Sequence, residues 1–122
     1  MSIISKSATQ QREMLRTGEL TSVELTTAYL EQIKTRESAI QAFVHVDEQQ
    51  ALADAEQIDT RRAAGEPLGD LAGIPVAVKD NLCSEGVPTT CASKILSGFI
   101  PPYDDTVVAK LKTADAVLIG RT

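Results

Sequence analysis

The sequence LAGIPVAVKDNLCSEGVPTTCAS, residues 71–93, decides which fold we expect for this chain. Its apolar run, residues 74–78, is typical of a strand buried on both faces of a parallel sheet. Lys79, Asp80 and Asn81 follow at once, and then come Gly, Pro and small hydroxyl residues. The stretch therefore predicts an α/β protein in which a buried strand ends at ionisable side chains and a loop.

The residues after this strand predict a second strand beside it. Residues 82–83 and 89–91 flank a Glu-Gly-Val-Pro turn and predict a small hairpin or an Ω-like loop. Two aspartates before Thr106 predict the start of a helix, and residues 116–119 read as another buried strand. A strand, a helix and a strand in this order predict a parallel, right-handed βαβ unit.

The first half of the chain predicts helices. Ser7 with Gln10 forms a capping-box pattern, which begins a helix over residues 8–17. Thr21 with Glu24 repeats this pattern and begins a second helix, which we expect to end near residue 36.

A strand and a third helix should complete this half. Residues 42–46 contain two β-branched valines between polar neighbours, which favours a short strand. Asp47 and Gln50 then open a helix that Gly65 closes. We accordingly expect residues 1–65 to be mainly helical and residues 66–122 to begin a sheet.

Composition limits the functions to consider. The formal net charge is −5, from 12 Lys and Arg against 17 Asp and Glu, and no basic run is present. Any nucleic acid should therefore be held mainly by a partner. The sequence has neither a signal-peptide pattern nor a membrane-spanning run, which predicts a cytoplasmic protein, or one of an organelle matrix, without membrane contact.

Metal and thiol chemistry are not expected. Two cysteines, Cys83 and Cys91, and the single histidine, His45, are too few and too scattered for a zinc site. We predict buried, reduced thiols and a structural histidine. No phosphate-binding glycine motif occurs, so no cofactor is expected in this chain.

Lys79 is the candidate catalytic residue, with two interpretations. A lysine at the carboxyl end of a buried strand lies where α/β sheets place their ligands, and desolvation there would make it a base. Alternatively, it is a solvated lysine at the end of a strand. Asp80 and Asn81 could orient groups around it or simply form the turn.

The motif resembles a known enzyme family. The residues that carry the resemblance are the run Gly-Ile-Pro-Val-Ala-Val-Lys-Asp-Asn, residues 73–81, followed by Gly86, Thr89, Thr90 and Ser93. They resemble the N-terminal part of the amidase signature family, and from about Leu15 onward the chain is similar to the family's glutaminase subunits of tRNA-dependent amidotransferases.

The resemblance implies a fold and a site. The chain would be the N-terminal fragment, residues 1–122, of a single amidase signature domain: helices followed by part of a mixed, mostly parallel sheet. Family members hydrolyse amides with a Ser-cisSer-Lys triad, whose lysine corresponds to Lys79. No residue before Thr122 matches either serine, so the chain alone should be inactive.

The resemblance also implies partners. The glutaminase subunit releases ammonia from glutamine, and the partner B and C subunits use it, with ATP consumed by the assembled complex, to convert Glu-tRNA(Gln) to Gln-tRNA(Gln). The alternatives are another family hydrolase acting on small amides and a non-catalytic remnant that binds a partner. Two residues depart from the family: Asp115 replaces a common Gly, at a cost of about 1 kcal/mol in a left-handed conformation, and Arg121 replaces a common Lys.

Overall fold

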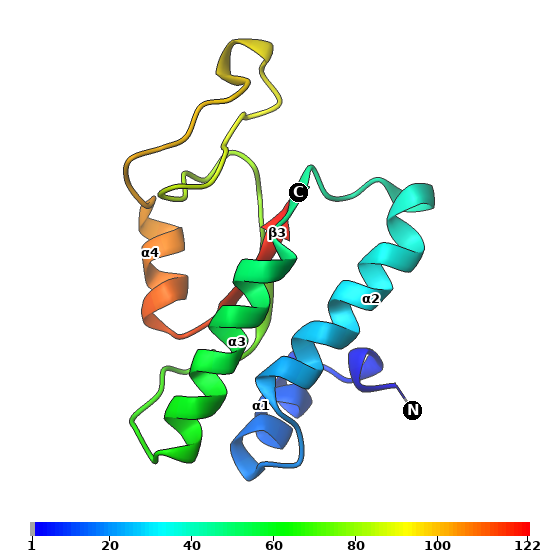
Figure 1. Cartoon of the computed structure of the whole chain (residues 1–122), viewed down its shortest axis with the longest axis vertical. Helices are drawn as coiled ribbons and strands as arrows, with labels where there is room; N and C mark the ends of the chain where they lie inside the picture. Colours follow the sequence, from blue (N-terminus) through cyan, green and yellow to red (C-terminus); the bar gives the residue numbers. More distant parts are fainter. Residues whose placement is uncertain (1) are drawn as a thin grey trace.

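The computed structural model describes residues 2–122 (Figure 1). In chain order its elements are η1 (Ile3–Ser5), α1 (Ala8–Thr17), α2 (Ser22–Ile40), β1 (His45–Val46), α3 (Glu48–Ala63), β2 (Pro75–Val78), η2 (Lys94–Leu96), α4 (Thr106–Thr113) and β3 (Val117–Arg121). The expected order of helices and strands is confirmed.

The three strands form one mixed sheet in the order β1-β3-β2. β2 and β3 are parallel, with Pro75 opposite Val117 and Val78 opposite Arg121, and the register shifts after Val76. β1 pairs antiparallel with β3 over two residues. The α/β class and the parallel pairing across α4 are therefore confirmed, and the carboxyl ends of β2 and β3 lie side by side.

The helix starts are those that the sequence predicts. Both capping boxes are formed, by Ser7 with Gln10 and by Thr21 with Glu24. Their side chains satisfy backbone N–H groups that have no partner within the helix. The end of α2 was predicted wrongly: it continues to Ile40 and stops where Gln41 is left-handed, with φ 55°.

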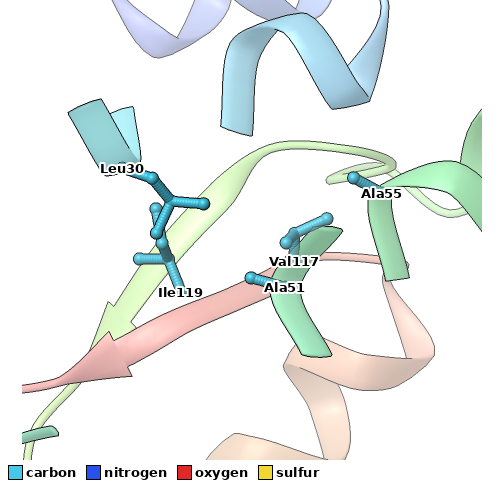
Figure 2. Packing of buried hydrophobic residues seen from close by; sticks show 5 residues of the cluster. All are labelled: Leu30, Ala51, Ala55, Val117 and Ile119. Atoms are coloured by element: carbon cyan, nitrogen blue, oxygen red, sulfur yellow. The ribbon is translucent and has the colours of Figure 1, made fainter. Parts of the chain in front are cut away.

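The main core lies between the sheet and the pair α2 and α3. Figure 2 shows its five fully packed residues, which are Leu30 from α2, Ala51 and Ala55 from α3, and Val117 and Ile119 from β3. The two alanines allow α3 to approach the strand closely, and alternate residues of β3 point to the same face. A second cluster, Leu15, Leu20, Leu25 and Ile74, joins α1 and α2 to the start of β2.

The opposite face of the sheet is less covered than the sequence suggests. Ala77 in β2 is exposed, and Pro75, Val76 and Leu118 are half-buried. The prediction of a strand buried on both faces is therefore wrong for β2, because α1 and α2 pack against only one of its faces.

The turn before β2 requires glycine for two reasons. Gly73 has φ +83°, and a Cβ placed there would lie 1.9 Å from Ser22 Oγ at the start of α2. Backbone direction and close packing thus both exclude a side chain. The close approach of Gly73 to Ser22 positions the start of β2 against α2.

The segment between β2 and α4 is a long loop that extends away from the helices (Figure 1). Its two limbs are joined by backbone hydrogen bonds from Gly86 N to Pro101 O and from Thr89 N to Phe99 O. The predicted hairpin between residues 82–83 and 89–91 is not formed, because the first limb pairs with the returning limb instead. The Ω-like alternative describes the loop better.

Candidate active site at the end of β2

Lys79 directly follows β2, and its side chain is exposed. The backbone on both sides of it is fixed: Thr122 N donates to Val78 O at 2.9 Å, and Asp80 N donates to Thr122 O at 2.8 Å. These bonds continue the parallel pairing of β2 with β3 by one residue beyond each strand. The chain therefore presents a lysine from a rigid backbone, but residues 2–122 do not supply the desolvation that we expected.

Asp80 is turned inward and forms a buried ion pair. It is 6% exposed and Arg121 is 3% exposed. Arg121 Nε donates to Asp80 Oδ1 at 3.1 Å. Since β2 and β3 are parallel, Asp80, the second residue after β2, and Arg121, the last residue of β3, meet at the same edge of the sheet.

The Arg121 guanidinium also binds the turn that contains Lys79. It donates to Ser84 Oγ at 2.8 Å, to Lys79 O at 3.4 Å and to Leu82 O. Buried charged groups are stable only when paired and hydrogen-bonded. Arg121 meets this condition by using its planar donors on one carboxylate, one hydroxyl and two carbonyls.

Thr90 links Asp80 to the far part of the loop. Its N–H lies 3.2 Å from both Asp80 carboxylate oxygens, and its hydroxyl donates to Oδ2. Cys91 N donates to Asp80 O at 2.9 Å. Cys91 and Ala92 follow with φ 50° and 55°, a left-handed pair without glycine. Asp80 therefore joins the two ends of the segment 80–91 by hydrogen bonds to Thr90 and Cys91.

The electrostatics of Asp80 favour its charged form. Burial alone would raise the pKa of this carboxyl, but the hydrogen bonds from Thr90 and the pairing with Arg121 outweigh burial and hold the pKa below its ordinary value. The pair is neutral as a whole. Among residues 2–122, no carboxylate lies within salt-bridge distance of Lys79.

The cysteines and the histidine do not form a site at this edge. Both cysteines are free, but Cys91 is exposed and Cys83 is half-buried, so the prediction of buried thiols is wrong. Cys83 Sγ lies 3.6 Å from the Tyr103 hydroxyl. Over the described part of the chain, no three His, Cys, Asp or Glu residues gather as a metal site. His45 is half-buried in β1, opposite Arg121.

A cleft of about 470 Å³ lies near this edge of the sheet, between α3 and the start of the loop. Arg121, Ser84 and Gly86 line it, together with the polar face of α3, but Lys79 does not.

A second ion pair supports the entry to β3. Asp115 has φ 61°, as its position after α4 implies, and its carboxylate accepts from Arg61 Nη1 at 2.7 Å and from Gly69 N at 2.6 Å. The loss of stability that we inferred from Asp115 in place of Gly is therefore opposed by two interactions. Sequence reasoning missed both, because their partners lie 54 and 46 residues away.

Comparison with protein families identifies the chain. A family model described as Amidase matches residues 24–122, which include Lys79, Asp80 and Arg121. The chain belongs to the amidase family. The resemblance seen in the sequence is confirmed, and the fold is that of the amidase signature enzymes.

Relatives of this chain carry a more specific name. The chain is 50% identical over 116 residues to the A subunit of glutamyl-tRNA(Gln) amidotransferase from Rhodopirellula baltica, covering 95% of this chain and 23% of the relative. A relative of the same name from Streptomyces avermitilis is 48% identical over all 122 residues, which are 24% of its length. The peptide amidase structure from Stenotrophomonas maltophilia superposes with a TM-score of 0.89 at 32% identity, covering 96% of this chain and 24% of that one.

The chain therefore spans about a quarter of the length of these relatives. In the described residues, no helix is both long and apolar enough to cross a membrane. The catalytic role of Lys79 stays a prediction.

Proposed function

We propose that this amidase segment belongs to the glutaminase subunit, the A subunit, of a glutamyl-tRNA(Gln) amidotransferase. The observation that carries the proposal is the 50% identity to a relative of that name over nearly the whole chain, including the ion-paired turn that presents Lys79. The substrate would be glutamine, and the products glutamate and ammonia.

Lys79 would be the base of the reaction. Its neutral amine would accept a proton from a bridging serine, which in turn takes the proton of the serine that attacks the amide carbon. Both serines would come from residues outside these 122. The same residues would have to cover Lys79, because desolvation favours the neutral amine that a base requires.

The remaining steps would occur on partner subunits. Ammonia would pass to the B subunit, where glutamyl-tRNA activated with ATP receives it, and the C subunit would complete the complex. The acidic balance of this chain supports a tRNA held mainly by partners. This chain needs no cofactor for its part of the reaction, and we expect the complex to work in the cytoplasm or an organelle matrix.

A second candidate is a hydrolase of small amides. The likeness to a peptide amidase, with a TM-score of 0.89, favours it, although the identity of 32% is lower than that to the amidotransferase relatives. Both candidates use the same lysine, so the substrate and the partners distinguish them.

The test is a chimera in which residues 1–122 replace the matching quarter of the Streptomyces avermitilis relative, produced with the partner subunits of that organism. Ammonia release from glutamine should require the whole chimera, and the 122-residue chain alone should release none. Glutamine hydrolysis by the isolated chain would contradict the proposal. A chimera that assembles with its partners but hydrolyses only small amides would support the second candidate.

A further inference from the structure

We propose that Arg121 is a positioning residue for Lys79: its guanidinium, anchored on Asp80, fixes the Lys79 carbonyl and thereby the direction in which the amine is presented. The inference rests on the proposed function, since it assumes that Lys79 takes part in the reaction. It adds a residue that does not touch the substrate.

The pairing with Thr122 fixes the backbone at Val78 and Asp80, but it leaves the carbonyls of Lys79 and Leu82 to other partners. The Lys79 side chain is exposed, and only the backbone of this residue forms hydrogen bonds within residues 2–122. Leu82 N donates to Lys79 O at 3.1 Å, which makes a single turn. A group presented from a turn keeps its direction best when further contacts hold the carbonyls of that turn.

Arg121 supplies these contacts from a rigid element. It is the last residue of β3, whose neighbouring residues Val117 and Ile119 are buried in the main core. Its guanidinium reaches Lys79 O and Leu82 O, at the beginning and the end of the turn. The contacts of Arg121 therefore fix the position of the turn relative to the sheet rather than relative to the loop.

Arg121 also controls the charge near the amine. Without Arg121, the Asp80 carboxylate would be an uncompensated negative charge close to the amine, and a nearby anion favours the ammonium form, which is a poor base. Arg121 and Thr90 occupy the carboxylate oxygens of Asp80 instead. The amine is left without an anionic partner among residues 2–122.

The closing experiment measures kcat and KM for glutamine in the chimera described above. Arg121→Met should lower kcat by about 100-fold, the cost of a misplacement on the order of 1 Å, with KM within about twofold. Arg121→Lys keeps the charge and three donors, so it should retain kcat within a few-fold. An unchanged kcat in Arg121→Met would overturn the inference and leave the proposed function intact, whereas full hydrolysis by Lys79→Ala would overturn the proposed function itself.

A double variant separates positioning from folding. Arg121→Met buries an unpaired carboxylate and can prevent folding, but adding Asp80→Asn removes that charge and keeps an acceptor for Thr90. The double variant should recover the thermal midpoint but not kcat. Recovery of both would mean that the pair serves only stability, and the inference would fail.

A matched control and a second readout complete the test. Arg61→Met breaks the ion pair with Asp115, and it should lower the thermal midpoint without changing kcat. In the 122-residue chain, Arg121→Met with Asp80→Asn should speed hydrogen exchange at the Asp80 and Cys91 amides about tenfold, and Arg61→Met should not. Unchanged exchange at both amides would also overturn the inference.

Discussion

Arg61 on α3 and Asp115, two residues before β3, form an ion pair with a distance of 2.7 Å, which links α3 to the start of β3. Asp115 is left-handed, and it also accepts a hydrogen bond from Gly69 N at 2.6 Å. Burial would raise the pKa of Asp115, but the Arg61 side chain and the Gly69 amide outweigh it and lower the pKa. The contacts of the Asp115 side chain with Arg61 and Gly69 therefore offset the strain of its left-handed backbone.

This relationship predicts the result of an exchange to glycine. Asp115→Gly relieves about 1 kcal/mol of backbone strain but leaves Gly69 N and Arg61 with fewer partners, which costs more. We expect a net loss of about 1 kcal/mol in the free energy of unfolding, measured by urea titration. Glu66→Gln is the control, since Glu66 pairs with Arg61 at 3.3 Å on the surface and should matter by less than about 0.5 kcal/mol. A stabilised Asp115→Gly variant would contradict the account.

Gly73 gives a prediction with an internal control. Gly73→Ala places a Cβ 1.9 Å from Ser22 Oγ at a φ of +83°, whereas Gly86→Ala meets no atom within 4 Å at a φ of +74°. Both variants bear the cost of a left-handed alanine, about 1 kcal/mol. We expect Gly73→Ala to be destabilised by about 2 kcal/mol more than Gly86→Ala, because only Gly73 is sterically blocked. Equal denaturation midpoints would show that the approach of α2 to β2 is looser than described.

The main core predicts a large cost for truncation at Leu30. This side chain is 3% exposed and packs against Val117 and Ile119. Leu30→Ala should lower the free energy of unfolding by about 2–5 kcal/mol, the usual range for a buried leucine. Ile95→Ala is the control, because Ile95 is 94% exposed in this chain and should change little. A change in the free energy of unfolding that is no larger for Leu30→Ala than for Ile95→Ala would show that Leu30 is not part of the main core.

Acid should weaken the buried pair in a defined direction. The folded pKa of Asp80 is lower than its unfolded value of about 3.9, so its contribution to stability is present above that pH. The contribution is lost as pH falls through the depressed folded pKa. The wild-type free energy of unfolding should therefore fall more steeply below about pH 4 than that of the Asp80→Asn, Arg121→Met double variant. Equal slopes would mean that Asp80 is not held as a carboxylate.

Local signals in the sequence predicted the elements but not the contacts that organise the site. Ser7 with Gln10 and Thr21 with Glu24 marked two helix starts, because capping acts between residues three apart. The end of α2 was missed because Gln41, not glycine, takes the left-handed conformation there. A non-glycine residue with positive φ leaves no clear sign in one sequence.

Sequence reasoning named one residue of the candidate site, Lys79, but it missed the ion pair between Asp80 and Arg121 that supports it. Lys79 stood out because it follows an apolar run. Arg121 did not, since its contact with Asp80 joins residues 41 apart and depends on the parallel register of β2 with β3. Once that pairing is expected, a charged residue at the end of each strand is a usable signal for an ion pair across the sheet edge.

The most direct test of the central claim is the activity of Lys79→Ala in the chimera with two ammonia sources. Glutamine-dependent formation of Gln-tRNA(Gln) should fall by about 10³-fold or more, while formation with added ammonia should persist, because the amine serves only to release ammonia. Lys79→Arg should behave alike, since a guanidinium does not lose its proton, and Lys94→Ala, an exposed lysine in the same loop, should retain both activities. Undiminished glutamine-dependent synthesis by Lys79→Ala would contradict the account.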